Sequence, residues 1–272
     1  MSDSTKINGL SDRTIADFGE QWTNFQDNDG YYGSAALFTD MCEPLVRADD
    51  VRGRRVADIG SGTGRIVRML VAAGAAHVVA VEPSAAYDVL CRNVADFGDR
   101  VECVRATGDR LPRDRQFDLI TSIGVLHHIP DPVPVVRAAY DALRPGGRLF
   151  VWLYGREGNR AYLAVTEPLR AVTTRLPHHV VVRLATFLQL LSKPYVRASR
   201  VLPLPLSRYF VEVFAHMTDE KQVLIIYDQL RPAYAKYYTR EEACHLLTSA
   251  GFSDVRVHHR HGYSWAVVGT KG

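Results

Sequence analysis

A glycine-rich loop between an apolar run and an amphipathic segment limits the folds open to this chain more than any other feature. The loop reads Asp-Ile-Gly-Ser-Gly-Thr-Gly over residues 58–64, directly after the apolar pair Val56 and Ala57. Apolar residues at helical spacing follow it from Ile66 to Val71. This order predicts a parallel strand, a tight turn and the N-terminus of a helix. In the turn, the glycines permit backbone angles, and a close approach of the ligand and the helix to the main chain, that a Cβ would prevent. We therefore expect an α/β fold whose loop offers free backbone N–H groups and a helix dipole to a ligand.

The glycine spacing separates two kinds of nucleotide-type ligand. Dinucleotide-binding loops follow G-x-G-x-x-G, whereas Arg65 here occupies the place of the third fingerprint glycine. With Asp58 in front, the loop has the form D-x-G-x-G-x-G and resembles the first motif of the class I S-adenosylmethionine-dependent methyltransferases. The resemblance implies S-adenosylmethionine as cofactor and S-adenosylhomocysteine as product, with Asp58 orienting the ammonium group or its water shell. It also implies that the loop wraps the amino-acid part and the ribose through Gly60, Ser61, Gly62 and Gly64.

Two later strand ends carry polar residues suited to the rest of this ligand. The apolar run His77–Val81 is followed by Glu82 and Pro83. Because neighbouring parallel strands end at one edge of a sheet, Glu82 should stand beside the loop and accept the ribose hydroxyls, with Pro83 next to it. A third strand leads to a segment that resembles the family's G-D-x-x-x-L-P, shortened by one residue. The resemblance implies that Asp109 meets the adenine amino group and the backbone of Arg110 a ring nitrogen, after the turn at Gly108.

The second strong motif spans residues 116–132, where a strand leads into Leu-His-His-Ile-Pro-Asp-Pro. It resembles the corresponding segment of ubiquinone/menaquinone-type and related small-molecule methyltransferases. The strand should end beside the first one, at the crevice where open α/β sheets bind ligands, so that Ser122, Ile123 and Gly124 flank the methionine part and the methyl group. Since imidazole titrates near neutral pH, His128, and less so His127, is a candidate general base. The alternative is that one histidine packs the helix start and the other is solvated.

Aromatic residues near the N-terminus have two interpretations. The segment from Ile15 to Phe25 predicts an amphipathic helix that packs its aromatic side chains on the sheet layer. Similar methyltransferases often have an N-terminal helix that closes on the ligand, with an aromatic residue near the sulfonium. In that case Trp22 contacts the cofactor, and Tyr31 and Tyr32 contact the acceptor.

The resemblance implies a doubly wound, Rossmann-like α/β fold with a seven-stranded, mostly parallel sheet. We expect a helical N-terminal lid at 1–50 and a cofactor-binding core made of 51–154 and 239–272. The intervening residues 155–238 exceed what the fold needs after strand five, and predict a helical cap over the acceptor. Thr239 should cap the helix that re-enters the core, with Glu in its first turn.

The cap carries the individual character of the chain. Three helices separated by prolines are expected at 159–176, 178–192 and 207–230, and residues 155–215 contain nine basic and three acidic side chains. A basic, apolar cap suggests a bulky apolar, anionic or carrier-bound acceptor, or contact with a membrane surface; solvated helix faces are the alternative. The re-entry segment adds acceptor-pocket candidates that could equally be packing: Tyr234, Tyr237 and Tyr238.

Composition narrows the function classes further. A net charge of +3 over 272 residues, with no appended RNA-binding module, argues against nucleic acid as a partner. Four scattered cysteines and a polar start predict reduced thiols and a cytoplasmic protein, and histidine spacing predicts no metal site. The favoured function is methyl transfer to an O, N or C atom of a small molecule, with a homodimer left open. The alternatives are an RNA or protein methyltransferase, and a cofactor-binding protein with a cyclase-like or regulatory role.

Overall fold

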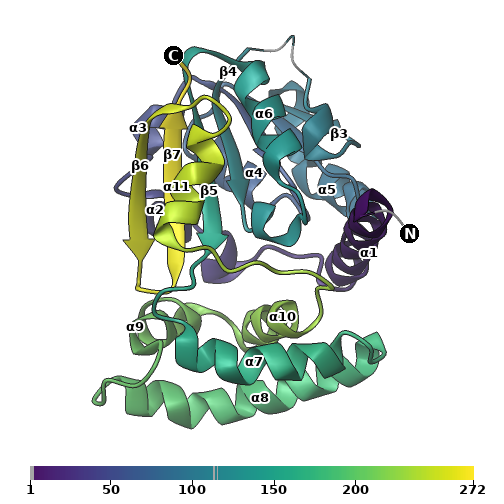
Figure 1. Cartoon of the computed structure of the whole chain (residues 1–272), viewed down its shortest axis with the longest axis vertical. Coiled ribbons are helices and arrows are strands. Elements are labelled where there is room, and N and C mark those ends of the chain that lie inside the picture. Colours follow the sequence, from purple (N-terminus) through teal and green to yellow (C-terminus); the bar gives the residue numbers. More distant parts are fainter. Residues whose placement is uncertain (1–2, 113, 115) are drawn as a thin grey trace.

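The computed structural model describes residues 3–112, 114 and 116–272, and a seven-stranded sheet organises it (Figure 1). The strand order is β3-β2-β1-β4-β5-β7-β6. The first five strands are parallel, and β7 runs antiparallel to both of its neighbours. The predicted fold class, a seven-stranded and mostly parallel sheet, is confirmed. The strands are β1 (Arg55–Ile59), β2 (His77–Val81), β3 (Val101–Val104), β4 (Phe117–Ile123), β5 (Leu143–Tyr154), β6 (Ser253–Arg260) and β7 (Ser264–Thr270).

Helices cover both faces of the sheet and bury two apolar clusters. Successive strand residues point to opposite faces, so that Val56 of β1 belongs to one cluster and Ala57 to the other. The first cluster takes Leu70 and its neighbours from α4, and the second takes Val136 from α6 and Leu247 from α11. The helices of the core and lid are α1 (Asp3–Asn24), α2 (Ala35–Cys42), α3 (Ala48–Val51), α4 (Arg65–Ala72), α5 (Tyr87–Val94), α6 (Val133–Ala142) and α11 (Arg240–Thr248).

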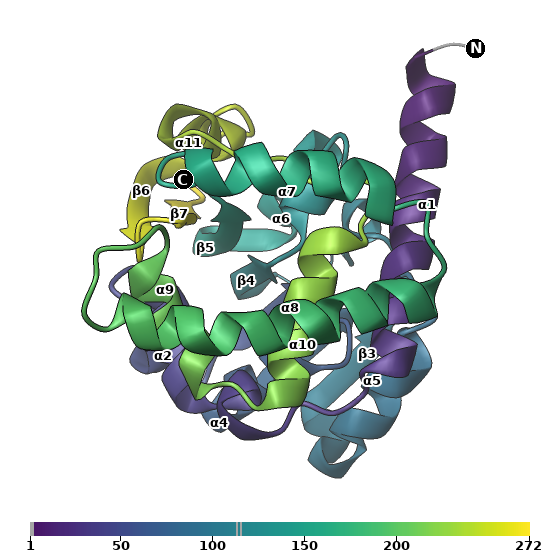
Figure 2. The ribbon, with the colours of Figure 1, turned by 90° about the horizontal axis from the view of Figure 1, so that it is seen from below.

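The cap lies beyond the carboxyl ends of the parallel strands, with α7 and α8 as its outermost elements (Figures 1 and 2). The expected helix at 207–230 is wrong, because three helical pieces occupy it. Thr218 starts a new helix there: its side chain accepts a hydrogen bond from the N–H of Lys221, and acidic residues fill the first turn. The cap consists of α7 (Arg160–Thr173), α8 (His178–Ser199), α9 (Ser207–Glu212), the 3-10 turn η6 (Phe214–His216) and α10 (Asp219–Leu230).

The expected separation of the cap helices by prolines is confirmed in part, because Pro177 precedes α8, and Pro203 and Pro205 lie between α8 and α9. Pro168 lies inside α7, and α8 continues through Pro194 to Ser199 instead of ending near Ser192. The re-entry into the core follows the prediction, because Thr239 and Glu242 form a capping box at the start of α11. The division of the chain at residues 50, 154 and 238 stays a prediction. None of the helices in the described residues is long and apolar enough to cross a membrane.

Candidate functional site

The glycine loop joins β1 to α4 and packs its backbone closely against two neighbouring segments. Gly60, Gly62 and Gly64 all have positive φ. A Cβ on Gly60 would lie 2.5 Å from a methyl carbon of Val125, and one on Gly64 would lie 2.9 Å from Val94. Glycine is therefore required at both positions, by backbone conformation and by close packing.

The expectation of free N–H groups in this loop is wrong for most of its residues. The N–H groups of Gly60 and Ser61 both donate to the carbonyl of Val81, at 2.8 and 3.1 Å, and that of Gly64 donates to Ser61. The N–H of Gly62 donates to the Glu82 carboxylate at 2.8 Å. The turn stabilises itself against the adjacent strand, because buried backbone donors need partners.

Glu82 lies where its place at the end of β2 predicts, beside the loop. Its second oxygen accepts from the N–H of Ser84 at 2.9 Å, and the side chain is buried. Two backbone donors therefore fix the orientation of this carboxylate, while each oxygen keeps a further lone pair for a ligand hydroxyl.

Asp58 is buried beneath the loop and does not line the cavity described below. One of its oxygens accepts from the hydroxyl of Thr121 at 2.7 Å, and the other has no partner in the described residues. Burial raises the pKa of Asp58 to about 7, although the Thr121 and Ser61 hydroxyls oppose this shift. A cationic group close to the loop would satisfy the unpaired oxygen and stabilise the ionised form.

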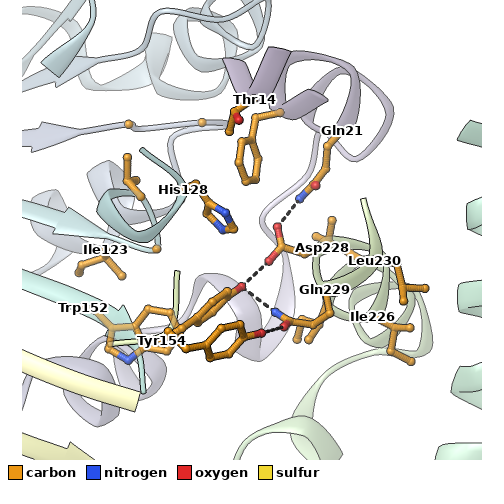
Figure 3. Close-up of a pocket in the computed structure, with 18 of the residues that line it drawn as sticks. Thr14, Gln21, Ile123, His128, Trp152, Tyr154, Ile226, Asp228, Gln229 and Leu230 are labelled. Atoms are coloured by element: carbon orange, nitrogen blue, oxygen red, sulfur yellow. Dashed lines mark hydrogen bonds between the residues drawn. The ribbon is translucent and has the colours of Figure 1, made fainter. Parts of the chain in front are cut away.

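A single cavity of about 1000 Å³ extends from the loop into the cap (Figure 3). It is walled by the inner face of α1, the carboxyl ends of β1, β2 and β4, and the cap helices. The predicted site residues that line it are Trp22, Tyr32, Gly60, Ser61, Gly62, Glu82, Pro83, Gly108, Asp109, Ile123, Gly124, His128 and Tyr237. The predicted site residues outside its lining are Tyr31, Asp58, Gly64, Arg110, Ser122, His127, Tyr234 and Tyr238.

Trp22 of α1 lies against the glycine loop. Its indole nitrogen would be 3.2 Å from a Cβ on Gly62, and the neighbouring Phe18 also lines the cavity. The amphipathic-helix and lid interpretations of α1 are therefore compatible, since one face of the helix both packs on the core and walls the cavity.

The two adjacent histidines have different surroundings. His128 lines the cavity, and its Nδ1 is 2.8 Å from the carbonyl oxygen of Tyr234. His127 is fully buried with its ring 3.8 Å from that of Tyr154, and neither of its ring nitrogens has a partner in the described chain. Burial lowers the pKa of both imidazoles, so both are neutral at pH 7. In neutral His128, donation from Nδ1 to the carbonyl leaves Nε2 as a proton acceptor.

A polar cluster that the sequence analysis missed stands opposite His128 (Figure 3). Asp228 of α10 accepts from Gln21 Nε2 at 3.0 Å and from the Tyr154 hydroxyl at 2.7 Å. Gln229 donates to the same hydroxyl at 2.6 Å and accepts from Tyr237 at 3.1 Å. The only sequence signal was a polar pair inside the apolar segment 223–230, which alone resembles an ordinary helix surface.

The remaining predicted tyrosines have packing contacts. Tyr32 is buried, with the Arg65 guanidinium 4.3 Å from its ring centre. Tyr31 packs its ring 5.3 Å from that of His216. Tyr238 is buried and joins the core through its N–H, which donates to the Tyr154 carbonyl. Their acceptor-binding roles, and that of Tyr234, stay predictions.

Comparison with known sequences assigns the central part of the chain to a family. Residues 57–151 match the profile of a family described as a methyltransferase domain. Relatives include the ubiquinone biosynthesis O-methyltransferases of Neisseria meningitidis serogroup C and Aromatoleum aromaticum. The first is 32% identical over 107 residues, which are 37% of this chain and 44% of the relative. The second is 34% identical over 136 residues, which are 49% of this chain and 57% of the relative. The chain thus spans about half the length of the curated relatives it matches.

Solved structures share the whole fold at low sequence identity. The 1,6-didemethyltoxoflavin-N1-methyltransferase of Burkholderia thailandensis has a TM-score of 0.55 at 16% identity, and the match covers 100% of this chain and 91% of that one. Human N-acetylserotonin methyltransferase has a TM-score of 0.50 at 16% identity, with 89% and 52% covered. The strand order, the glycine loop and the matched profile together define the class. The chain contains a class I S-adenosylmethionine-dependent methyltransferase domain.

Proposed function

We propose that the chain transfers the methyl group of S-adenosylmethionine to an O, N or C atom of a small molecule. The observation that carries this proposal is the continuity of the cavity. One end contains the glycine loop with Glu82 and Asp109, and the other contains the cap residues around Asp228. A cofactor held at the first end and an acceptor held at the second would share one continuous space.

The residues at the cofactor end fit S-adenosylmethionine in charge and in hydrogen-bonding capacity. The unpaired, buried oxygen of Asp58 suits the vicinity of the cofactor ammonium, and the fixed carboxylate of Glu82 suits ribose hydroxyls. Asp109 lines the same end and is assigned to the adenine amino group. S-adenosylmethionine supplies a methyl group already activated by its sulfonium, so the chain needs chiefly to align the acceptor and exclude water.

The acceptor end contains the group best placed to take a proton. His128 is neutral and in the cavity wall, with Nε2 free to accept a proton once Nδ1 has donated to Tyr234. We assign general-base catalysis to His128 where the acceptor must lose a proton, and a packing role to His127.

A small acceptor is favoured over RNA or protein because the lid and the cap cover the acceptor end and leave a cavity of about 1000 Å³. The relatives and structural neighbours include methyltransferases named for the biosynthesis of ubiquinone, for N-acetylserotonin and for 1,6-didemethyltoxoflavin, all of which are small molecules. The alternative is that the chain binds the cofactor without transferring its methyl group. Measuring turnover distinguishes this alternative from the proposal. Cytoplasmic location stays a prediction.

The test has two stages. Calorimetric titration with S-adenosylmethionine, S-adenosylhomocysteine and NADH should show binding of the two sulfur compounds alone; binding of NADH alone would contradict the assignment of the loop. A panel of phenols, catechols and N-heterocycles with and without alkyl chains is then offered with methyl-labelled S-adenosylmethionine. Label in a product supports transfer, and cofactor binding without label in any product favours the non-methylating role.

A further inference from the structure

Among residues 9–112, 114 and 116–272, every exposed large hydrophobic side chain lies in the cap. These side chains lie on α7, on α8 and on the first two residues of the loop that follows α8. On most soluble proteins, exposed large hydrophobic residues are instead scattered singly over the surface. The fractions exposed are high, for example 57% for Phe187 and 81% for Val201. We name the set the cap patch: Val165, Val172, Phe187, Leu190, Leu191, Val201 and Leu202.

The outer face of α8 combines this apolar character with positive charge. Exposed residues recur at intervals of three or four, so they form one stripe along the helix. The stripe contains Arg183, Phe187, Leu190, Pro194 and Arg197, and Val201 continues it just beyond the end of the helix. Helix α8 contains no acidic residue, and no ion pair to Arg183, Arg197 or Arg200 occurs among the residues that the structure describes. From Arg183 to Arg197 this stripe extends over about 21 Å of the helix.

The cavity reaches the same part of the cap. Val165 of α7 and Leu191 of α8 are exposed and also line the cavity, as does Tyr195 one turn further along α8. Figure 2 shows α7 and α8 as the outermost helices of the cap, with α10 behind them. Apolar side chains therefore continue from the outer surface of the cap into the cavity.

We propose that the cap patch docks onto an anionic lipid bilayer with α8 lying in the plane of the interface. Apolar side chains flanked by arginines match the two layers of such a surface, hydrocarbon and anionic headgroups. A second copy of the chain matches poorly, because a two-fold contact between two such stripes sets arginine against arginine without a carboxylate on α8 to neutralise them. Docking places Val165 and Leu191 against the lipid. If the proposed methyl transfer is correct, an acceptor with a hydrophobic tail fits this arrangement.

Vesicle binding tests the docking without reference to catalysis. The 272-residue chain is co-sedimented with phosphatidylcholine vesicles and with vesicles that contain about one third phosphatidylglycerol. We expect binding to the anionic vesicles, strongly reduced at about 0.5 M NaCl, where exposed charges are screened. Absence of binding to the anionic vesicles, or equal binding to both kinds, overturns the proposal.

Two double variants separate the contributions of charge and apolar contact. Each basic residue near an anionic leaflet contributes about fivefold in affinity, so Arg183→Gln/Arg197→Gln should weaken binding by roughly 25-fold. Phe187→Gln/Leu190→Gln should weaken it at least about tenfold by removing apolar insertion. The matched control, Arg52→Gln/Arg137→Gln, removes two exposed arginines outside the cap and should bind the vesicles as the parent does.

Two further measurements exclude trivial explanations. S-adenosylhomocysteine affinity is measured for each variant, and it should equal that of the parent because the substituted side chains lie outside the cavity lining. If one variant does not fold, the other decides the outcome. Unchanged vesicle binding in a folded cap variant overturns the proposal. A concentration-dependent dimer that Phe187→Gln/Leu190→Gln dissociates also overturns it, because the patch would then be a self-association surface.

Discussion

Gln21 and Asp228, which are 207 positions apart in the chain, are joined by a hydrogen bond of 3.0 Å across the cavity wall. This bond links the lid helix α1 to the cap helix α10. Arg231 at the end of α10 also pairs with Glu20 at 2.6 Å. The lid and the cap are therefore connected directly, and we expect movements that open the cavity to involve both elements.

A buried lysine provides a test of this connection. Lys221 of α10 is only 2% exposed, and its Nζ lies 2.7 Å from both the carboxylate and the backbone carbonyl of Asp27, just after α1. Asp27→Asn should lower the free energy of unfolding by about 1–2 kcal/mol, because the buried ammonium loses its charged partner but keeps the carbonyl. Urea denaturation measures this, with Asp29→Asn as the matched control. Equal stability of the two variants would show that the ion pair contributes nothing.

The pH dependence of the same pair has a definite sign. Burial alone would raise the pKa of Asp27, but the Lys221 ammonium and the N–H of Asp29 together more than offset this and lower it below 3.8. A carboxylate with a lowered folded-state pKa stabilises the protein above its unfolded pKa and loses that contribution as the pH falls through the folded value. The stability difference between the parent and Asp27→Asn should therefore shrink below about pH 3.8.

Cofactor binding should release a proton from Asp58. With its pKa raised to about 7 by burial, Asp58 is partly protonated at neutral pH, and a ligand ammonium nearby would favour its ionised form. Calorimetric titration of S-adenosylhomocysteine at pH 7 in buffers of different ionisation enthalpy should show release of a fraction of one proton. Asp58→Asn should remove that release. Buffer-independent heats for the parent protein would contradict the ammonium contact.

The parallel sheet and the cofactor end could be predicted from the sequence because their signals are local. The alternation of short apolar runs and glycine-rich turns determines where each strand ends, and parallel strands end at one edge. That rule sufficed to place Glu82 beside Gly62, which the hydrogen bond of 2.8 Å confirms. The expectation of free N–H groups in the loop was wrong. The hydrogen bonds from Gly60 and Ser61 to the carbonyl of Val81 depend on how closely β2 approaches the loop, which the sequence does not show.

The acceptor end could not be predicted, because its polar cluster assembles from three distant segments. Gln21, Tyr154 and Asp228 meet only through the packing of α1 and α10 over the end of β5. Nothing in the residues around Asp228 distinguishes it from an acid on an exposed helix face. The break within 207–230 was missed for a related reason, since Thr218 caps a new helix inside a segment with continuous helical periodicity.

Glu82 should contribute to cofactor affinity through hydrogen bonds to the ribose. Glu82→Gln keeps the shape but loses the charge and one acceptor, so S-adenosylhomocysteine should bind more weakly by about 1.5–3 kcal/mol. Isothermal titration measures the change. Because Glu82 also accepts from Gly62 and Ser84, thermal unfolding without ligand serves as the control for damage to the loop. Unchanged affinity in a folded variant would place the ribose elsewhere.

The role of His128 as a base predicts a particular pH profile. Burial lowers its pKa below 6.5, so the active, neutral form should persist throughout the neutral range and the rate should fall only at more acidic pH. With an acceptor that must lose a proton, His128→Ala should lower kcat about 10²- to 10⁴-fold and leave S-adenosylhomocysteine affinity unchanged. Full activity of that variant would contradict the role of His128 as a base. A rate in the parent enzyme that already falls above pH 6.5 as the pH is lowered would contradict it too.

Asp228 should position the acceptor rather than bind the cofactor. Its carboxylate holds the Tyr154 hydroxyl at 2.7 Å, and burial raises the pKa of that tyrosine well above 10, so Tyr154 stays neutral. Asp228→Asn keeps the size and a carbonyl acceptor but removes the charge that faces His128. For an accepted substrate, KM should rise about tenfold or more while S-adenosylhomocysteine affinity stays unchanged, since a hydrogen bond to a charged group contributes about 1.5–3 kcal/mol.

The loss of the Asp228 charge should also lower the pKa of His128 further and move the acid limb of the rate profile to lower pH. Tyr154→Phe, which removes only the hydroxyl bound by Asp228 and Gln229, should reproduce the KM effect in part. A variant with normal KM and an unshifted pH profile would show that Asp228 serves only to join the cap to the lid.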